Sequence, residues 1–309
     1  MCRRSGVHHV IMDPAAAIPD FPDSRPLSLE DKPRLDAIFA TLQPRISEYT
    51  FAGLYLFRQA HAYRLCQVAD GVLTILGQGY DGAHYALPPL AADPVRAAAA
   101  LLQAGVPLYG VTPEWLGQFG LPAGGRVVPD RDSFDYLYAR EGLATLAGRR
   151  YHKKLNRVNY FTRRHDYRVV MFEASLRPGC LSLLATLSRL QDGAEMKPSL
   201  AAELAACAEA LQLHDLLGLE GLVVLVSGKV AAFALGERLN RETTVCHFEK
   251  MDPFLEGVGQ LINREYARLL FTDSPLINRE QDLGEPGLRA AKLSYHPQAM
   301  VEKYRVYPA

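Results

Sequence analysis

The sequence lacks a net charge, a cysteine framework and any long hydrophobic run. Lys+Arg and Asp+Glu both total 34, so no overall field draws the chain to nucleic acid or an anionic membrane, and any such contact needs a local patch. The five cysteines are odd in number and form no Cys-x-x-Cys pair, which argues against a disulfide framework or a zinc site and favours a reducing cytosol. No stretch approaches the ~18 apolar residues of a membrane-spanning helix. The sequence therefore predicts a soluble, cytoplasmic protein without a metal site.

Length and composition indicate a globular protein with more than one core. The chain has 309 residues, of which 49% are hydrophobic and 22% are charged. Because a single hydrophobic core rarely grows beyond ~250–300 residues, this length favours two domains of about 150 residues each. Four prolines in residues 1–26 indicate an N-terminal tail. We therefore expect a tail over 1–26, one domain over 27–165 and a second over 166–309.

Both halves show the same order of expected elements. Ser28 is placed to cap a helix, and the Asp-Gly turn at Asp70 indicates a hairpin. The first half is expected to contain helices at 30–42, 47–57 and 93–104, a hairpin at 62–76 and a strand at 83–87. The second half is expected to contain strands at 167–173 and 243–249, helices at 179–191, 198–216 and 259–270, and a hairpin at 222–238. Because segments 106–115 and 274–283 follow the last of these helices in each half, we interpret the halves as two copies of one α/β unit.

A strand, a glycine-containing loop and an amphipathic helix follow one another over residues 247–271. Gly257 and Gly259 lie in the loop. The residues expected to face inward from the helix are Leu261, Ile262, Ala267 and Leu270. Such a junction presents free backbone N–H groups at a positive helix end, which suits a phosphate. A plain strand-to-helix turn explains the glycines equally well, because the segment is neither a P-loop nor a full dinucleotide fingerprint.

A basic segment covers residues 149–168, with eight Lys or Arg and one acidic residue. Apolar residues at spacings of three and four predict one helix with a buried face and a basic face. These apolar residues are Leu143, Ala147, Tyr151, Leu155, Val158 and Phe161. The basic face, which includes Lys153, Lys154 and Arg157, suits RNA phosphates, anionic lipid head groups or a cofactor phosphate. A solvated or salt-bridged face is the alternative interpretation.

Two candidates for acid–base chemistry lie near the end of the strand at 243–249. His247 and Glu249 are two residues apart, so a regular strand directs them to the same face. Glu249 is placed to act as a general base. A half-buried salt bridge from Glu249 to Lys250 or Arg241 explains it nearly as well.

The segment Ile277–Pro297 combines amide, carboxylate, ammonium and phenol side chains around two glycines. A short helix is expected at 287–294, between Pro286 and Pro297. Arg289, Lys292 and His296 lie three and four residues apart, so their side chains are predicted to converge. The polar residues of this segment include Asn278, Glu280, Asp282, Arg289, Lys292, Tyr295 and His296. A polar network that ties the C-terminal segment to the rest of the protein is the alternative.

Four segments together resemble a bacterial family of undetermined activity that is related to the C-terminal domain of phosphatidylglycerol lysyltransferase. They are LSLEDKPRLDAIFATLQPRISEYTFAGLYLFR (27–58), DYLYAREGLATLAGRRYHKKLNRVNYF (135–161), CHFEKMDPFLEGVGQLINREYA (246–267), and INREQDLGEPGLRAAKLSYHP followed by VEKYRV (277–306). The resemblance implies an α/β fold of two tandem domains of the GCN5-related N-acetyltransferase (GNAT) type, each with a mixed, mostly antiparallel sheet flanked by helices. In that superfamily the phosphates of acyl-coenzyme A bind the loop after the fourth strand. Here Gly257 and Gly259 keep the glycines of that loop, but its usual leading Arg or Gln is missing.

The resemblance and the residues together predict an acyl- or aminoacyl-transferase with its active site in the second domain. The donor is acyl-coenzyme A or charged tRNA, and the acceptor is an amine or hydroxyl of a small molecule or peptide. A non-catalytic module that binds tRNA or a small ligand is the alternative. The predicted roles are Glu249 as base and Tyr295 as acid; Gly257, Gly259, Gln260, Arg289 and Lys292 for the donor; Asn278, Glu280, Asp282 and His296 for the substrate; and Lys153, Lys154 and Arg157 for nucleic acid.

Overall fold

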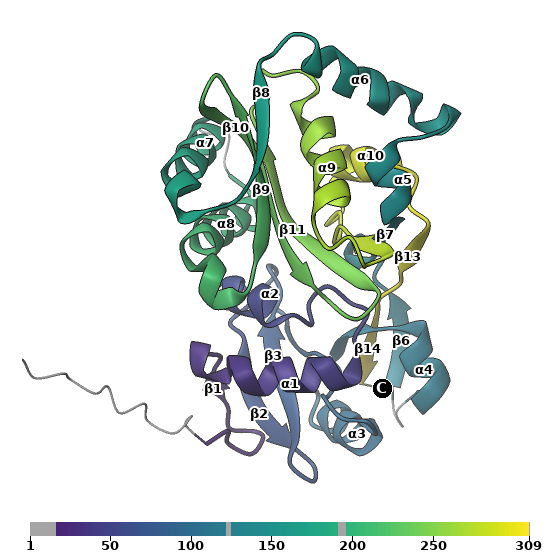
Figure 1. The fold of residues 1–309 in the computed structure, drawn as a ribbon. Helices are drawn as coiled ribbons and strands as arrows, with labels where there is room; N and C mark the ends of the chain where they lie inside the picture. Colours follow the sequence, from purple (N-terminus) through teal and green to yellow (C-terminus); the bar gives the residue numbers. More distant parts are fainter. Residues whose placement is uncertain (1–16, 122–124, 191–195, 309) are drawn as a thin grey trace, which may run out of the picture.

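Two seven-stranded sheets organise the molecule, one below the other in Figure 1. The computed structural model describes residues 17–121, 125–190 and 196–308. The first sheet has the order β1 (Arg25–Pro26), β2 (Arg64–Val68), β3 (Val72–Gln78), β4 (His84–Ala86), β5 (Leu108–Val111), β14 (Tyr304–Pro308) and β6 (Gly125–Pro129). The second has the order β13 (Ala299–Val301), β7 (Asp135–Ala139), β12 (Leu276–Asn278), β11 (Thr243–Met251), β10 (Lys229–Arg238), β9 (Glu220–Val226) and β8 (Tyr167–Met171).

Helices flank both sheets. In the first half they are η1 (Leu29–Asp31), α1 (Lys32–Leu42), α2 (Phe51–Leu56), α3 (Val95–Gln103), α4 (Pro113–Phe119), η2 (Arg131–Ser133), α5 (Arg140–Thr145), η3 (Arg149–Tyr151) and α6 (His152–Thr162). In the second half they are η4 (Ala174–Leu176), α7 (Arg177–Arg189), α8 (Pro198–Leu217), α9 (Val258–Leu269) and α10 (Pro286–Leu293). Figure 1 places α7 and α8 on one face of the second sheet and α9 with α5 on the other. None of the described helices is both long and apolar enough to cross a bilayer.

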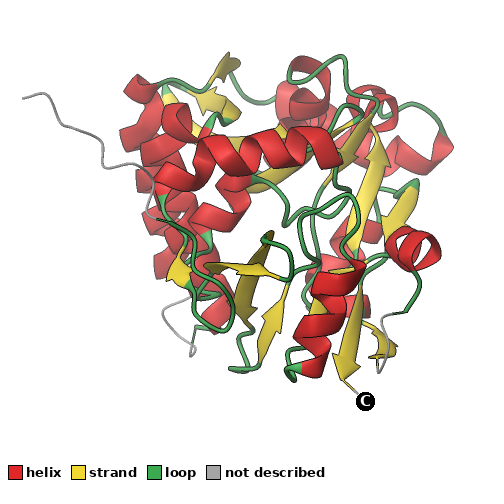
Figure 2. Ribbon diagram, turned by 90° about the horizontal axis from the view of Figure 1, so that it is seen from below, coloured by secondary structure: helices red, strands yellow, loops and turns green. Residues whose placement is uncertain are grey.

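The predicted fold class is confirmed, and the two sheets repeat one topology. In each, an antiparallel hairpin leads to a strand that pairs in parallel with the strand after a crossover helix: β4 with β5 around α3, and β11 with β12 around α9. The other strand pairs of both sheets are antiparallel. Viewed from below in Figure 2, one long helix crosses the middle of the molecule, and the strands run beside and below it between other helices. The segments 106–115 and 274–283 supply β5 and β12, as the predicted duplication requires.

The sheets exchange strands. β7 comes from the middle of the chain and lies between β12 and β13 of the second sheet. β14 comes from the end of the chain and lies between β5 and β6 of the first sheet. The predicted domain boundary at residue 165 stays a prediction. Each sheet nevertheless contains a strand from the other side of that boundary. Of the expected tail, 1–16 lies outside the described residues, and β1 pairs with β2.

A buried lysine joins the two crossings of the chain between the sheets. Lys303 lies between β13 and β14 and is fully buried. Its ammonium donates to both oxygens of Glu48, at 2.8 and 2.6 Å, and to Asp135 Oδ1, at 2.6 Å. Burial opposes the charge, but these two carboxylates raise the pKa of Lys303 above its ordinary value. Because Asp135 begins β7, one ion-pair network fixes both exchanged strands.

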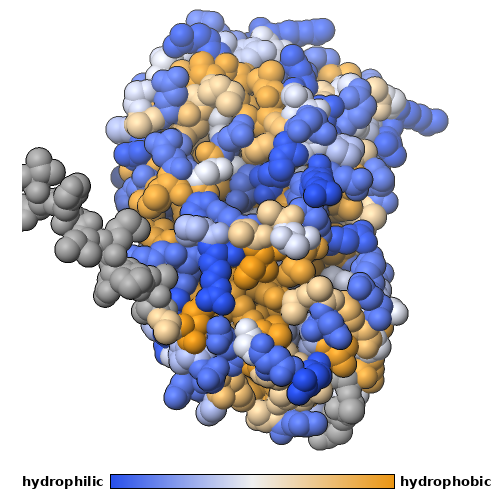
Figure 3. Space-filling view, turned by 60° about the horizontal axis from the view of Figure 1, so that its bottom comes forward, coloured by the Kyte–Doolittle hydropathy of each residue, from blue (hydrophilic) through white to orange (hydrophobic). Residues whose placement is uncertain are grey.

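One hydrophobic cluster runs through both sheets. It includes Phe51 and Leu54 of α2, Leu211 of α8 and Phe233 of β10. The ring of Phe248 on β11 stacks on Phe57 just after α2, with 6.4 Å between centroids. On the surface shown in Figure 3, hydrophilic and hydrophobic residues are mixed, and hydrophobic ones gather in the lower half. The two sheets therefore share a core and form one packed body.

The single helix predicted over 143–161 is wrong. α5 ends at Thr145, Leu146 has a φ of 49°, and Gly148 has a φ of 88°. These left-handed residues end one helix before α6 begins at His152. Val158 and Phe161 of α6 are buried as predicted, whereas Ala147 in the break is exposed. The inward face predicted for α9 is confirmed, because Leu261, Ile262, Ala267 and Leu270 are buried.

Candidate functional site

The candidate site lies where β11 and β12 separate. The two strands pair through only three residues of each, from Thr243 with Leu276 to Val245 with Asn278. β11 continues to Met251 alongside β10. Its residues 246–251 therefore have a strand on one side only within the described chain. We call this gap between the end of β11 and the residues after β12 the opening.

A β-bulge at His247 changes which way its side chain points. Phe248 pairs with Leu235 and Cys246 pairs with the adjacent Gly236, which leaves His247 without a partner in the register. The extra residue reverses the alternation of side chains along β11. The prediction that His247 and Glu249 share a face is wrong for this reason. His247 faces α2 and the first sheet, whereas Glu249 faces α9.

On the first face, His247 crosses the opening between two carboxylates. Its Nε2 lies 2.9 Å from Glu237 Oε1, and its Nδ1 lies 2.7 Å from Glu280 Oε1. The imidazole side chain is 1% exposed. Burial disfavours the charged ring, but the hydrogen bonds to Glu237 and Glu280 outweigh it and raise the pKa of His247 to about 10. His247 is therefore a charged brace rather than an acid–base catalyst near neutral pH.

On the second face, Glu249 and Arg279 cross the opening as an ion pair. Arg279 donates from Nη2 to Glu249 Oε2 at 3.0 Å, and Asn263 of α9 donates to the same oxygen at 3.1 Å. Neither Lys250 nor Arg241 is the partner of Glu249; Lys250 pairs with Glu203 instead. The other oxygen of Glu249, Oε1, has no hydrogen-bond partner among the described residues. That oxygen is free to act on a ligand.

Aromatic and basic side chains complete this face. The Arg279 guanidinium lies 5.8 Å from the ring of Tyr138 and 5.3 Å from that of Tyr295. The Lys154 ammonium lies 4.1 Å from the ring of Tyr295 and donates to Ser294 Oγ at 2.6 Å. Burial raises the pKa of Tyr295 above its usual range, although the charge of Arg279 and a hydrogen bond with Gln260 oppose this. We call this set the Glu249 cluster: Glu249, Asn263, Arg279, Tyr295, Gln260 and Lys154.

The convergence of Arg289, Lys292 and His296 is wrong. Arg289 forms ion pairs with Asp282, at 2.7 Å, and with Asp132, at 2.6 Å. His296 is exposed, and its nearest polar partner is the carbonyl oxygen of Arg150, 3.2 Å away. The three side chains diverge because His296 lies beyond the end of α10, with a φ of 54°.

Lys292 holds the turn that follows β12. Its ammonium donates to the carbonyl oxygens of Arg279 at 2.6 Å, Glu280 at 3.1 Å and Gln281. Burial lowers the pKa of Lys292 to about 8. With its donors directed at the backbone, Lys292 fixes the residues that brace the opening. Its predicted role on the donor stays a prediction.

The four predicted substrate residues occupy different places. Asn278 is buried and donates to Asp135 Oδ2 at 2.9 Å. Asp282 is buried between Arg289 and Tyr136, whose hydroxyl donates to it at 2.5 Å. Glu280 is bonded to His247 on the first face, and His296 lies at the surface. The structure thus distributes the polar side chains predicted to cluster in 277–297 among the networks of Asp135, Asp282 and His247, the Glu249 cluster and the surface.

The glycine turn is closely packed against α6. Gly257 has a φ of 96°, and a Cβ there would lie 2.3 Å from the carbonyl oxygen of Arg157. A Cβ on Gly259 would lie 3.1 Å from the sulfur of Met251. Both glycines are therefore explained by backbone conformation and packing. Their assignment to a donor phosphate stays a prediction.

The basic segment divides between the cluster and the surface. Lys154 belongs to the Glu249 cluster, and Arg157 pairs with Glu256. Besides Arg157, and Arg168 on β8, the exposed basic residues are Arg149, Arg150, Lys153, Arg163 and Arg164, and none of these five has an acidic partner in the described part of the chain. The guanidinium of Arg164 stacks on the exposed ring of Tyr160, 3.7 Å from its centroid. We call Arg149, Arg150, Lys153, Arg163 and Arg164 the α6 basic surface.

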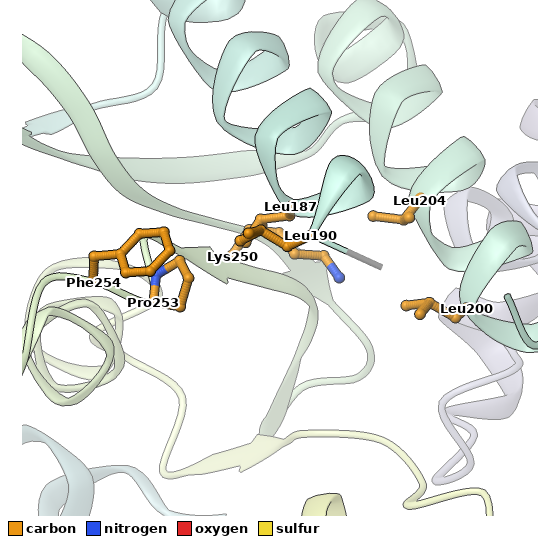
Figure 4. Close-up of a pocket in the computed structure, with 7 residues that line it drawn as sticks. All are labelled: Leu187, Leu190, Leu200, Leu204, Lys250, Pro253 and Phe254. Atoms are coloured by element: carbon orange, nitrogen blue, oxygen red, sulfur yellow. The ribbon is translucent and has the colours of Figure 1, made fainter. Parts of the chain in front are cut away.

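Two surface cavities lie elsewhere. One, of about 470 Å³, is formed by leucines of α7 and α8 and by the loop after β11 (Figure 4). Its lining residues are Leu187, Leu190, Leu200, Leu204, Lys250, Pro253 and Phe254. The other, of about 380 Å³, includes Arg45, Arg241 and Leu276. Neither includes a residue of the Glu249 cluster.

Sequence reasoning missed Asn263 and Arg279. One signal could have found them: the five residues Leu-Ile-Asn-Arg-Glu occur twice, at 261–265 and 276–280. The first copy lies in α9 and the second starts in β12, so the Asn of one and the Arg of the other meet at Glu249 Oε2. Hydrophobic periodicity assigns one copy to a helix and the other to a strand, so it does not reveal that the two segments have the same sequence.

The family described as "Phosphatidylglycerol lysyltransferase, C-terminal" matches residues 39–307. A conserved protein of unknown function from Bacteroides thetaiotaomicron has a similar structure, with a TM-score of 0.84 and 28% identity over 93% of this chain and 99% of that one. The C-terminal domain of a putative lysylphosphatidylglycerol synthetase from Agrobacterium fabrum shares the fold, with a TM-score of 0.60 and 15% identity over 91% of this chain and 92% of that one. An uncharacterized protein of Mycoplasmoides gallisepticum is 24% identical over 177 residues, which are 56% of each chain. The matched region thus spans little more than half of that relative.

Proposed function

Because this chain belongs to the family of the phosphatidylglycerol lysyltransferase C-terminal domain, we propose that it transfers an acyl or aminoacyl group to an amine or hydroxyl at the opening between β11 and β12. The observation that carries the proposal is Glu249. Its Oε2 is fixed by Arg279 and Asn263, while Oε1 is left for a substrate beside an unpaired strand edge. A base needs this combination of fixed orientation and one available lone pair.

The transfer uses the Glu249 cluster as follows. The acceptor amine or hydroxyl attacks the carbonyl carbon of the donor, and its proton passes to Glu249. The bond from that carbon to the leaving sulfur or oxygen breaks, and the leaving group takes the hydroxyl proton of Tyr295. Exchange with solvent restores both residues. Burial raises the pKa of Tyr295, so the phenol keeps its proton until a basic leaving group forms.

Acyl transfer also requires stabilisation of the oxyanion, which backbone groups on β11 can supply. N–H groups on the unpaired edge of 246–251 can donate to the oxyanion that develops on the carbonyl. Holding donor and acceptor together in the opening contributes through orientation, which is worth about 7–11 kcal/mol in favourable systems. His247 and Lys292 keep the opening at a fixed width, so they act as positioning residues.

Charged tRNA is the donor that the surface favours over acyl-coenzyme A. The α6 basic surface lies on and directly beside the two ends of α6, the helix that supplies Lys154 to the Glu249 cluster, so RNA bound there would place its end near the opening. Exposed Arg and Lys with a stacked Tyr160 suit phosphates and bases. The tight packing at Gly257, by contrast, leaves the glycine turn occupied by α6.

The test measures transfer with the purified chain from charged tRNA and from acetyl-coenzyme A to a panel of amines and hydroxyls. Glu249→Gln should lower kcat/KM by about 100-fold or more, whereas His84→Ala on the exposed end of β4 should leave it unchanged. Reversal of Lys153, Arg163 and Arg164 to Glu should weaken tRNA binding and reduce its dependence on salt.

The outcomes separate the two classes of function. tRNA binding that survives Glu249→Gln, with no transfer from either donor, supports the non-catalytic module and removes the transferase. Transfer from acetyl-coenzyme A that the charge reversal leaves unaffected keeps the transferase and removes tRNA as donor. Equal activity of Glu249→Gln and the unaltered chain would show that the base lies elsewhere.

A further inference from the structure

The Glu249 cluster carries more positive than negative charge. Lys154 and Arg279 face the ring of Tyr295 from distances of 4.1 and 5.3 Å, and Glu249 forms an ion pair with Arg279. Burial and the charge of Arg279 lower the pKa of Lys154, which shows that the two cations repel each other. Arg279 uses Nη2 for Glu249, and its Nε and Nη1 have no hydrogen-bond partner within the described residues. Two cations with spare donors therefore lie beside Tyr295, and among the described residues only Arg279 has a carboxylate partner.

A second observation concerns Asn263. Its side chain is 3% exposed, and its Oδ1 is buried without a hydrogen-bond partner in the part of the chain described. The orientation of the amide is set by Glu249, because only the Nδ2 end can donate to that carboxylate. An unmet buried acceptor costs free energy, which a hydrogen-bond donor from a ligand would recover. Oδ1 belongs to the same amide that contacts Glu249, so this donor arrives beside the proposed base.

We infer that the Glu249 cluster is a binding site for a compound in which a carboxylate or phosphate lies a few bonds from a hydroxyl or amine. Lys154 and Arg279 bind the anionic group, and Asn263 Oδ1 accepts a hydrogen bond from the hydroxyl or amine. Glu249 Oε1 then lies next to that same nucleophile. The inference rests on the proposed function for the identity of this compound as the acceptor.

Glu249 competes with a bound anion for the guanidinium of Arg279. The carboxylate of Glu249 occupies one donor of Arg279, so an incoming anion shares Arg279 with it. Removing the negative charge at position 249 therefore strengthens the binding of an anion while it removes the base. A purely structural ion pair predicts the reverse, because Arg279 would lose its only carboxylate partner among the described residues and the cluster would loosen.

The test titrates the full chain with matched pairs of small anions, followed by NMR or calorimetry. Lactate and propionate share a carboxylate and differ in a hydroxyl; O-phosphoethanolamine and methyl phosphate share a phosphate and differ in an amine. We expect the hydroxyl- or amine-bearing member to bind about 2- to 10-fold more tightly. Lys154→Met should weaken all four by about tenfold, Asn263→Leu should abolish the difference within each pair, and Glu249→Gln should strengthen all four. The preferred pair identifies the anionic group as carboxylate or phosphate.

Several outcomes overturn the inference. These are no saturable binding of any of the four compounds, unchanged affinities in Lys154→Met, or an undiminished difference within the pairs in Asn263→Leu. Weaker anion binding by Glu249→Gln assigns the ion pair a structural role. Circular dichroism checks that each variant folds, and Lys154→Met is the variant safest for the fold because Lys154 is only half-buried. Binding without any transfer activity removes the proposed function and leaves this site standing; transfer activity without anion binding does the opposite.

Discussion

The two halves of the molecule contain the same strand–helix–strand crossover, but among the described residues ion pairs cross the opening only in the second half. In the first half, β4 and β5 pair at the single position Ala86 with Leu108. The residues after β4 are apolar, and Leu87 and Leu90 are buried. The carbonyl oxygen of Pro88 accepts a hydrogen bond from Tyr49. After β5, Thr112 caps α4 through the N–H of Trp115. The first opening is thus closed by packing and local backbone bonds.

The second opening is held by side chains on both faces. His247–Glu280 crosses it on the face toward the first sheet, and Glu249–Arg279 crosses it on the face toward α9. Buried ion pairs contribute little net stability compared with apolar packing. Their use in only one of two matched openings therefore points to a role beyond folding, and the common topology by itself does not create a site.

The largest effect on stability is expected from removing the buried charge of Lys303, which joins the two halves. Lys303→Met leaves Glu48 and Asp135 buried without their cation and should lower the free energy of unfolding by about 3–5 kcal/mol. Urea unfolding measures this value. Lys32→Met, which breaks a pair with Asp36 on the surface of α1, is the control and should cost under about 1 kcal/mol. Equal losses would show that the two halves do not depend on the exchanged strands.

The next test removes one brace of the second opening. The pKa of His247 is raised from 6.5 to about 10 by Glu237 and Glu280 against the effect of burial. A raised histidine pKa contributes stability that is complete below pH ~6.5 and disappears as pH rises toward ~10. His247→Gln should therefore lower the free energy of unfolding by about 2–3 kcal/mol at pH 6, since Gln still donates one hydrogen bond.

Comparing the two proteins over a range of pH provides the control for the His247→Gln prediction. The difference between His247→Gln and the unaltered chain should shrink steadily from pH 6.5 to 10, when followed by urea unfolding at each pH. A constant difference over that range would mean that His247 is neutral in the folded protein and that the brace is an ordinary hydrogen bond.

Much of the fold was predictable from local signals. The Asp-Gly and Ser-Gly turns form the hairpins β2–β3 and β9–β10, because the backbone at Asp70 and Gly228 has the positive φ that such turns need. The order of elements is repeated in the two halves, and this repeat predicted the tandem architecture. The strand exchange was not predictable, since β7 and β14 have the same apolar pattern whichever sheet they join.

The candidate site was less predictable for a geometric reason. One extra residue in β11 at His247 turns its side chain to the other face, and no period in the sequence marks a bulge. Glu249 and Tyr295 were chosen for their chemistry and lie in one cluster, but Arg279 between them was not chosen. The predicted convergence around Lys292 treated His296 as if it kept the helical spacing, although the expected helix ended at residue 294; α10 ends at Leu293, and His296 has a positive φ.

The smallest expected effect compares a glycine in each crossover. Gly105 follows α3 with a φ of 81° and has open space within 4 Å of the position that a methyl group would occupy, whereas Gly257 precedes α9 with a φ of 96° and abuts Arg157. Gly105→Ala should cost about 1 kcal/mol from backbone strain alone. Gly257→Ala should cost about 1–2 kcal/mol more, because α6 must move away from α9 to admit the methyl group. Urea unfolding measures both values, and the fluorescence of a probe on Lys153 reports the movement of α6. Equal costs would show that α6 is loosely attached, and the contact of Lys154 with Tyr295 would then not be a fixed part of the second opening.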